Sequence, residues 1–288
     1  MAEHEIDEVT GQPTTGHEWD GIKELRSPIP RWWVWTFYVT IAWAVAFLIA
    51  MPAIPLMNGY TKGVLGFSQR DSVRADIVDA RAAQSGFRDR IEQASLEEIR
   101  DIPDLFDFAV AGGKSAFSVN CSQCHGAGGA GAPGFPNLND DAWIWGGKPE
   151  QILETVRVGI RSDHDDTRFN QMPAFLTDEI LTRDQVADVV EYVLQISGQE
   201  HEQDSAGRGQ TVFLEQCSSC HQENGKGIRE LGGPNLTDAI WLYGGSKDEI
   251  RKTVANSRNG VMPAWEDRLD EVTRKQLAVY VHALGGGE

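Results

Sequence analysis

An uninterrupted apolar stretch near the N-terminus is the strongest hydrophobic feature of the chain. No charged residue occurs from Trp32 to Thr61, and Val, Ile, Ala, Leu, Phe and Trp dominate as far as Met57. About 20 apolar helical residues cover the roughly 30 Å hydrocarbon layer of a bilayer. The pattern therefore predicts a transmembrane anchor over residues 32–60, with aromatic side chains at the two membrane interfaces, namely Trp32, Trp33, Trp35 and Tyr38 at one end and Tyr60 at the other.

The segment before the anchor distinguishes it from a cleaved signal peptide. A signal peptide has a short basic segment and an apolar core of about 7 to 15 residues, whereas here a tail rich in Glu and Asp, residues 1–31, precedes a longer apolar run. An uncleaved anchor is the better interpretation. Its orientation does not follow from charge, because Lys and Arg residues flank it on both sides.

Apolar residues at helical spacing follow the anchor. Residues 61–107 are predicted to form a helical connector, in which Ser95 and Glu98 make a capping box. Two later helices are predicted from valines and leucines recurring every three or four residues: one begins at a Thr182/Gln185 capping box and the other at Thr273/Gln276. No βαβ pattern is present, so the fold class is mainly α.

The chain beyond residue 108 repeats itself. Cys121-Ser122-Gln123-Cys124-His125 returns 96 residues later as Cys217-Ser218-Ser219-Cys220-His221. Other segments recur at similar offsets: Gly113 and Phe117, Pro136-Asn137-Leu138, the Trp143 segment ending in Gly146-Gly147, and Met172-Pro173-Ala174. The first copy holds eight extra residues, which we place around residues 162–169. Two tandem domains of one kind are predicted, over residues 108–199 and 204–288.

Composition narrows the classes of partner. The 288 residues include 26 Lys and Arg against 43 Asp and Glu, a formal net charge of −17. Such a charge repels phosphate backbones and argues against nucleic-acid binding, so a basic protein partner is expected. The 4 cysteines are too few for a disulfide scaffold, and all of them lie in the two repeated motifs.

The CxxCH spacing has a chemical reason. Two thiols three residues apart can each form a thioether to one haem vinyl group, and the next residue is then close enough to the iron for its imidazole to coordinate. A thioredoxin-like dithiol would need βαβ patterning, and zinc binding would need the two Cys pairs close together. Two covalently bound haem c groups are therefore predicted, with thioethers at Cys121, Cys124, Cys217 and Cys220 and iron ligands His125 and His221.

The second iron ligand is predicted by elimination. Of the 5 methionines, Met1 starts the chain and Met51 and Met57 fall in the anchor, which leaves Met172 and Met262 at matching places in the repeats. Whether each Met binds the haem of its own repeat or that of the other stays open. Competing ligands are His164 in the extra loop and His282 on the last helix, and Trp143 and Trp241 are expected to pack on haem or core, with a propionate hydrogen bond as the alternative.

The whole layout resembles the dihaem subunit III, the CcoP type, of the cbb3-type cytochrome c oxidases. The resemblance rests on the single anchor before a tandem pair of CxxCH motifs, each followed by Met-Pro-Ala-aromatic, and on the longer Gly159–Met172 segment of the first copy. It implies two class I cytochrome c domains, in which Pro136 and Pro234 offer their carbonyls to the imidazoles of His125 and His221.

The resemblance also implies partners and a place in the cell. A soluble or anchored basic cytochrome c would donate electrons, which would pass to a monohaem cytochrome c subunit and then to the haem-copper catalytic subunit that reduces O2 and pumps protons. The protein would lie in the bacterial inner membrane with its cytochrome domains in the periplasm and would carry no catalytic site itself. The alternatives are an anchored dihaem cytochrome serving a periplasmic dehydrogenase, or a dihaem peroxidase with one exchangeable iron site.

Overall fold

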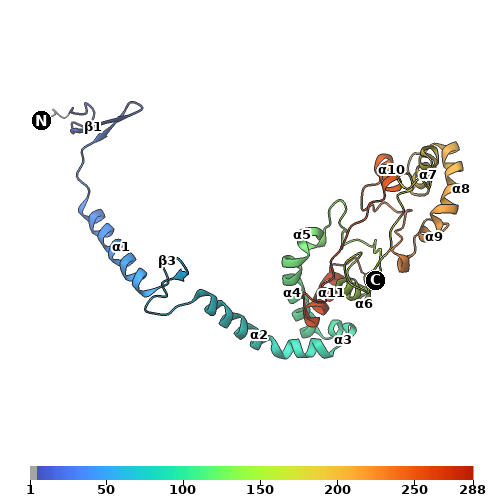
Figure 1. Ribbon diagram of the computed structural model, residues 1–288, viewed down its shortest axis with the longest axis horizontal. Helices are drawn as coiled ribbons and strands as arrows, with labels where there is room; N and C mark the ends of the chain where they lie inside the picture. The colour runs from blue at the N-terminus through green and yellow to red at the C-terminus, as the bar shows by residue number, and fades with distance from the viewer. Residues whose placement is uncertain (1–4, 288) are drawn as a thin grey trace. The chain divides into compact units, whose positions relative to one another are not determined.

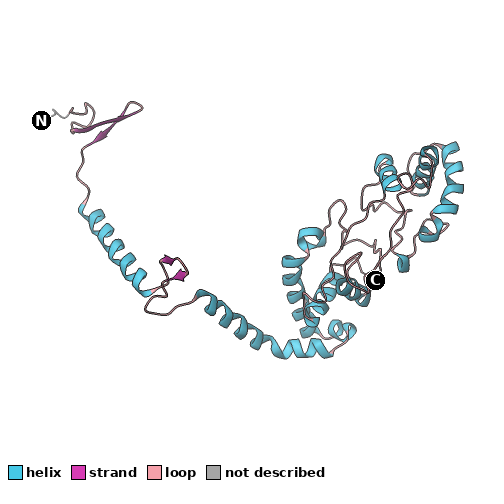
Figure 2. Cartoon of the chain, in the orientation of Figure 1, coloured by secondary structure: helices cyan, strands magenta, loops and turns pink. Residues whose placement is uncertain are grey.

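A computed structural model describes residues 5–287, which form two units, divided at Ala82/Ala83. Residues 1–4 of the predicted tail and Glu288 lie outside the described residues. Helices dominate (Figure 2), so the mainly α fold class predicted from the sequence is confirmed.

The first unit contains the apolar helix and two small antiparallel hairpins. Strands β1 (Thr14–Trp19) and β2 (Ile22–Leu25) pair within the tail, an element the sequence analysis did not predict. Helix α1 (Arg31–Ala50) has no buried residue and is long and apolar enough to cross a membrane.

The helix ends earlier than the apolar composition suggested. Met51 is extended, with ψ 161°, because the ring of the following Pro52 disfavours the helical conformation at the residue before it. Strands β3 (Pro55–Leu56) and β4 (Gly59–Tyr60) then form a tight hairpin. The prediction of a continuous anchor over residues 32–60 was therefore too long, and Tyr60 lies on a strand rather than at a helix end.

Three helices lead to the first CxxCH motif. Helix α2 (Gln69–Gln93) begins in the first unit and ends in the second, and α3 (Leu96–Asp101) starts with the predicted capping box of Ser95 and Glu98. Helix α4 (Pro103–Asn120) begins inside the range assigned to the connector, because Pro103 is favourable in a first helical turn, where its missing N–H costs nothing.

The remaining helices follow the repeat. The first copy contains α5 (Ser122–His125), the short 3-10 turn η1 (Ala127–Gly129), α6 (Pro149–Val158) and α7 (Arg183–Ile196). The second contains α8 (Gln203–Gln216), α9 (Ser218–His221), η2 (Arg229–Leu231), α10 (Lys247–Asn256) and α11 (Glu271–Ala283). The capping box predicted for α7 is present, but the one predicted for α11 is wrong: Asp270 caps that helix by accepting from the Thr273 backbone N–H, and Gln276 is buried.

The C-terminal helices of the two copies are exchanged. Helix α4 packs against α11, and α8 packs against α7, so the helix that leads into each CxxCH motif is covered by the last helix of the other repeat (Figure 1). Phe117 of α4 contacts Tyr280 of α11 at a ring-centroid distance of 5.5 Å, and Phe213 of α8 contacts Tyr192 of α7 at 5.1 Å. Edge-to-face and tilted aromatic pairs at such distances are favourable beyond the area they bury.

The repeated glycines have a reason in this packing. A Cβ atom added at Gly113 would lie 2.2 Å from the Gln276 carbonyl oxygen of α11, and one at Gly209 would lie 2.0 Å from the Asp188 carbonyl oxygen of α7. Both helix pairs therefore approach so closely at these points that any larger side chain would clash with backbone.

Two hydrophobic cores result, and neither coincides with one repeat. The first core is formed by the end of α2 together with α3, α4, α6 and α11, and its buried members include Ile91, Ile99, Leu105, Phe117, Val156, Leu277 and Tyr280. The second core is formed by α7, α8 and α10, and its buried members include Phe175, Val189, Val190, Tyr192, Phe213, Ile250 and Val254.

The chain passes between the cores at one crossing. It leaves the first core after α6, builds the whole second core, and returns at Met262; at the crossing Ile160 and Met262 exchange two backbone hydrogen bonds of 2.9 and 3.0 Å. The ranges 108–199 and 204–288 are thus repeats of sequence, whereas the second core is a nearly continuous segment inserted into the first.

Candidate haem centres

Each CxxCH motif begins as the preceding helix ends. Cys121 and Cys217 are the C-cap residues of α4 and α8, and each contributes its side chain to the adjacent core. A single further turn, α5 or α9, then carries the second cysteine and the histidine of each motif. The structure therefore brings both cysteines and the histidine of each motif together on one short stretch of helix.

The two imidazoles have equivalent hydrogen-bond partners, each a proline carbonyl oxygen. His125 Nδ1 lies 3.0 Å from the Pro136 carbonyl oxygen, and His221 Nδ1 lies 3.0 Å from the Pro234 carbonyl oxygen. A carbonyl oxygen only accepts, so Nδ1 carries the proton and Nε2 keeps a lone pair. Such a second hydrogen bond is the usual way in which a metal-binding imidazole is oriented and made more basic.

The surroundings of the motifs are apolar and keep the side chains neutral. Burial raises the pKa of the Cys121 thiol to about 11 and that of Cys217 to about 12, with the neighbouring thiol of each motif adding to the shift. Burial also lowers the pKa of His125 and His221, against the opposing effect of the hydrogen bond to proline. At neutral pH the thiols of Cys121 and Cys217 and both imidazoles are therefore uncharged.

The two candidate methionines lie in opposite cores from the motifs of their own repeats. Met262, of the second repeat, packs in the first core, where Cys121 also packs. Met172, of the first repeat, packs in the second core with Cys217. Each Met therefore packs in the core of the other repeat's CxxCH motif.

The alternative ligands have other partners. His164 Nε2 lies 2.6 Å from Glu266 Oε2, and Glu266 also binds Arg157. The His164 side chain is thus part of a hydrogen-bond and ion-pair network at the extra loop of the first repeat. His282 is partly buried on α11, and burial and then Arg100 lower its pKa. Trp143 packs in the first core and donates from Nε1 to the Gly286 carbonyl, and Trp241 packs in the second core.

Sequence reasoning missed a pair of arginines. Arg168 lies over the Trp145 ring at 5.4 Å from its centroid, and Arg258 lies over the Tyr243 ring at 4.8 Å. The two arginines are 90 residues apart, the same offset as the two methionines, and each stands four residues before its Met. That repeated offset was a signal in the sequence that could have identified them.

These residues fit a haem. Each CxxCH motif supplies two free thiols and a neutral imidazole with a free nitrogen, and the thioether sulfur of Met262 or Met172 packs in the same apolar cluster as the first cysteine of the motif. In addition, Arg168 Nε is buried and has no hydrogen-bond partner among residues 5–287, as expected of a cation that meets an acidic group of a cofactor.

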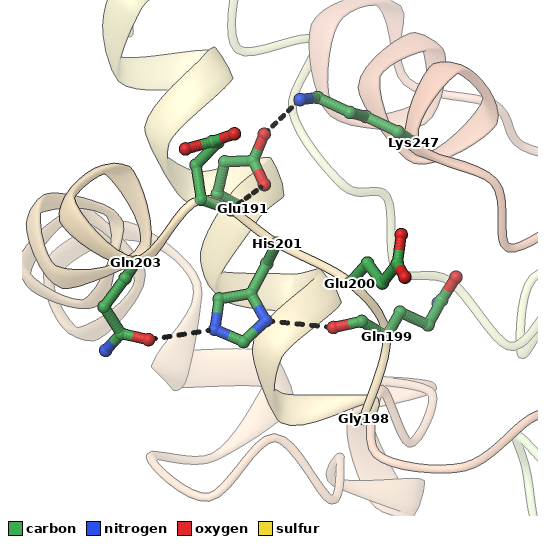
Figure 3. Close-up of a pocket in the computed structure, with 8 residues that line it drawn as sticks. Glu191, Gly198, Gln199, Glu200, His201, Gln203 and Lys247 are labelled. Carbon is green, nitrogen blue, oxygen red and sulfur yellow. Dashed lines mark hydrogen bonds and ion pairs between the residues drawn. The ribbon is translucent and has the colours of Figure 1, made fainter.

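An open cavity lies elsewhere, at the connection between α7 and α8. Its lining includes Glu191, Glu200, His201 and Lys247, and Figure 3 shows the Glu191 carboxylate between Lys247 and the start of α8. None of the cysteines, histidines or methionines described above lines it.

Comparison with known proteins gives the family. Residues 11–58 match the family model of the N-terminal domain of cytochrome oxidase-cbb3, FixP; residues 110–197 match cytochrome c; and residues 204–281 match cytochrome c oxidase, cbb3-type, subunit III. The cbb3-type cytochrome c oxidase subunit CcoP of Cereibacter sphaeroides is 50% identical over 96% of both chains. The corresponding CcoP of Azospirillum sp. (strain B510) is 48% identical over 100% of both, and the subunit FixP of Rhizobium meliloti (strain 1021) is 49% identical over 98% of both.

The chain belongs to the CcoP/FixP family. It is therefore an electron-transfer subunit of a cbb3-type cytochrome c oxidase, with haem c as its cofactor and α1 as its membrane anchor. Membership of the CcoP/FixP family also means that it works within a complex of oxidase subunits.

Proposed function

We propose that this CcoP-type subunit carries two covalently bound haem c groups, one in each core. Cys121 and Cys124 would form the thioethers of the first haem and Cys217 and Cys220 those of the second, with His125 and His221 as proximal iron ligands. The observation that supports this most is the repeated geometry, in which each imidazole is oriented by a proline carbonyl at 3.0 Å beside two free thiols.

The distal ligands are exchanged between the repeats. Met262 would bind the iron held by His125, and Met172 the iron held by His221. The support is that each Met packs in the apolar core of the opposite CxxCH motif, and that the Ile160–Met262 pairing fixes the returning chain beside α6 of the first core.

When bound, each haem supplies a one-electron iron centre, and His/Met ligation gives it a high potential. The chain's own residues hold and orient that centre and keep water away from it. Burial among apolar residues raises the pKa of the Cys121 and Cys217 thiols. These apolar residues are the part of the site that excludes water.

The electron path and the orientation complete the proposal. Electrons would enter from a soluble or anchored basic cytochrome c and leave toward the monohaem cytochrome c subunit and the haem-copper catalytic subunit. Because haem c is attached outside the cytoplasm, residues 61–288 would lie in the periplasm of a bacterium, with the tail before α1 in the cytoplasm.

Variants with a single haem test the ligand assignment. In a chain with Cys217→Ala and Cys220→Ala only the first haem is attached, and a denaturing gel should retain its haem stain. Met262→Ala in that background should abolish the near-infrared sulfur-to-iron charge-transfer band, whereas Met172→Ala, the matched control, should leave it. The opposite result would mean that each Met serves its own repeat.

A further inference from the structure

The two arginines that stack on Trp145 and Tyr243 occupy equivalent places. Arg168 Nη2 donates to the Gln151 carbonyl oxygen of α6 at 3.2 Å, and Arg258 Nη2 donates to the Glu249 carbonyl oxygen of α10 at 2.7 Å. Positions 151 and 249 are themselves repeat equivalents, at the offset of 98 that relates the Trp143 and Trp241 segments.

Each arginine lies beside the segment that holds the candidate distal ligand of its core. Arg168 bridges to Ile160 from one side while Met262 pairs with Ile160 from the other. Arg258 follows Ser257, whose hydroxyl donates to the Met172 carbonyl oxygen. Arg168 therefore lies at the edge of the first core, and Arg258 lies at the edge of the second.

The side chains at positions 151 and 249 give the surroundings of the two arginines different charges. Glu249 Oε2 binds Arg258 Nη1 at 2.5 Å and so neutralises its charge; its other oxygen binds the exposed Lys252. Gln151 is neutral, and its Oε1 accepts from the Lys148 backbone N–H. Arg168 has no ion pair within residues 5–287, since the nearby Glu154 is bound by Arg157 at 2.9 Å, and its Nε is buried without a hydrogen-bond partner.

A fixed positive charge stabilises the reduced form of a nearby haem, which carries one more electron than the oxidised form, and a carboxylate has the opposite effect. Arg161 does not distinguish the sites, because it donates to the Gly260 and Asn170 carbonyl oxygens and so contacts both segments that run between the cores.

We propose that Arg168, which forms no ion pair within residues 5–287, gives the haem attached at His125 the higher midpoint potential, and that Glu249 lowers the potential of the haem attached at His221. Electrons then move within the subunit from the second haem to the first. The inference rests on the proposed function, since it assumes one haem in each core.

Redox titration of the full-length, haem-loaded protein tests the inference with isosteric variants. Gln151→Glu should lower the higher of the two potentials by about 59 mV, which is a tenfold change in the reduced-to-oxidised ratio for a one-electron couple. Glu249→Gln should raise the lower potential by a similar amount. Gln185→Glu is the control: it adds one negative charge at the same third position of an exposed capping box, on α7, and should change neither potential.

Assignment to a core comes from the chain with Cys217→Ala and Cys220→Ala, which keeps only the haem attached at His125 and should retain the higher potential. The inference is overturned if that chain retains the lower potential instead, or if Gln151→Glu shifts the potentials no more than Gln185→Glu does. The haem content, measured first, separates the two proposals. Two haems per chain with unshifted potentials would overturn this inference alone, whereas fewer than two would overturn the proposed function as well.

Discussion

Individual side chains explain why each helix has the partner it has. Gly113 and Gly209 remove the side chain where two helices touch, and Phe117 and Phe213 fill the space beside them. The sequence analysis recognised these residues as repeated, but the role of Gly113 depends on Gln276, 163 residues further along the chain, and that of Gly209 on Asp188 in the preceding helix. A repeated residue indicates that a contact recurs; it does not identify the other side of that contact.

The residue Glu191 joins three helices of the second core. Its buried carboxylate binds Lys247 of α10 and accepts from the Glu202 backbone N–H at the start of α8, at 3.0 Å (Figure 3). Burial alone would raise the pKa of this carboxyl, but Lys247 and the Glu202 N–H outweigh burial, so its pKa is lowered.

Glu191→Gln should therefore lower the free energy of unfolding at neutral pH by about 1 to 2 kcal/mol, since the pairing cation is exposed and partly screened. A carboxyl with a lowered pKa stabilises the fold above its unfolded value, 4.5, and this contribution is lost as the pH falls through the folded value. Denaturant titrations of variant and wild type should differ at pH 7 and converge below pH 4.5. Glu200→Gln, an exposed neighbour with no ion pair in the described part of the chain, should match the wild type at both pH values.

At the scale of elements, local pattern predicted the helices and not their partners. Valines and leucines at helical spacing gave α7 and α11, and Pro52 explains why α1 stops short of the predicted anchor end. The exchange could not be predicted from these patterns, because α7 and α11 present similar apolar faces and either would cover α4. One signal was available: only residues 197–202 separate α7 from α8, and so short a connection favours an antiparallel helical hairpin.

Fragments of the chain should show the exchange directly. Residues 170–258 contain all helices of the second core together with Met172, so this fragment, matured with haem, should fold as a low-spin His/Met cytochrome with one haem. The two sequence repeats, 108–199 and 204–288, each lack the helix that covers their own CxxCH motif. They should bind haem without a sulfur-to-iron band and should melt without cooperativity. A native spectrum from 204–288 and none from 170–258 would contradict the exchange.

At the scale of the whole molecule, the proposed orientation rests on one chemical argument. Lys and Arg residues flank α1 on both sides, so charge does not orient it. The proposed covalent attachment of haem would require that the CxxCH motifs reach the periplasm. Protease added to spheroplasts should therefore release haem-bearing fragments and leave the tail before Arg31 protected. Permeabilised cells are the control, in which the tail should be digested too. Digestion of the tail in intact spheroplasts would reverse the proposed orientation.

The net charge of −17 is also a property of the whole molecule, because the electrostatic attraction of a partner sums the charges of many side chains. Any single surface acid is most simply a solubilising group. A field of one sign, however, raises the association rate of an oppositely charged protein by roughly 10 to 10³-fold, and salt removes the effect as the Debye length shrinks from about 30 Å at 0.01 M to about 8 Å at 0.15 M. Reduction of the haem-loaded protein by a basic cytochrome c should therefore slow steeply with added salt in stopped-flow measurements.

We expect this field to act on a donor at the loop that only the first repeat contains. Asp163 and Asp165 are exposed there and form no ion pair within residues 5–287. Replacing both by Asn should reduce the slope of the logarithm of the rate against ionic strength, because two charges near a candidate haem centre are removed. Asp76→Asn with Asp79→Asn removes two equally exposed charges from α2 and should leave the slope unchanged. Equal slopes for both double variants would mean that the donor docks away from the extra loop, and a rate independent of salt in the wild type would mean that an apolar patch, and not charge, selects the donor.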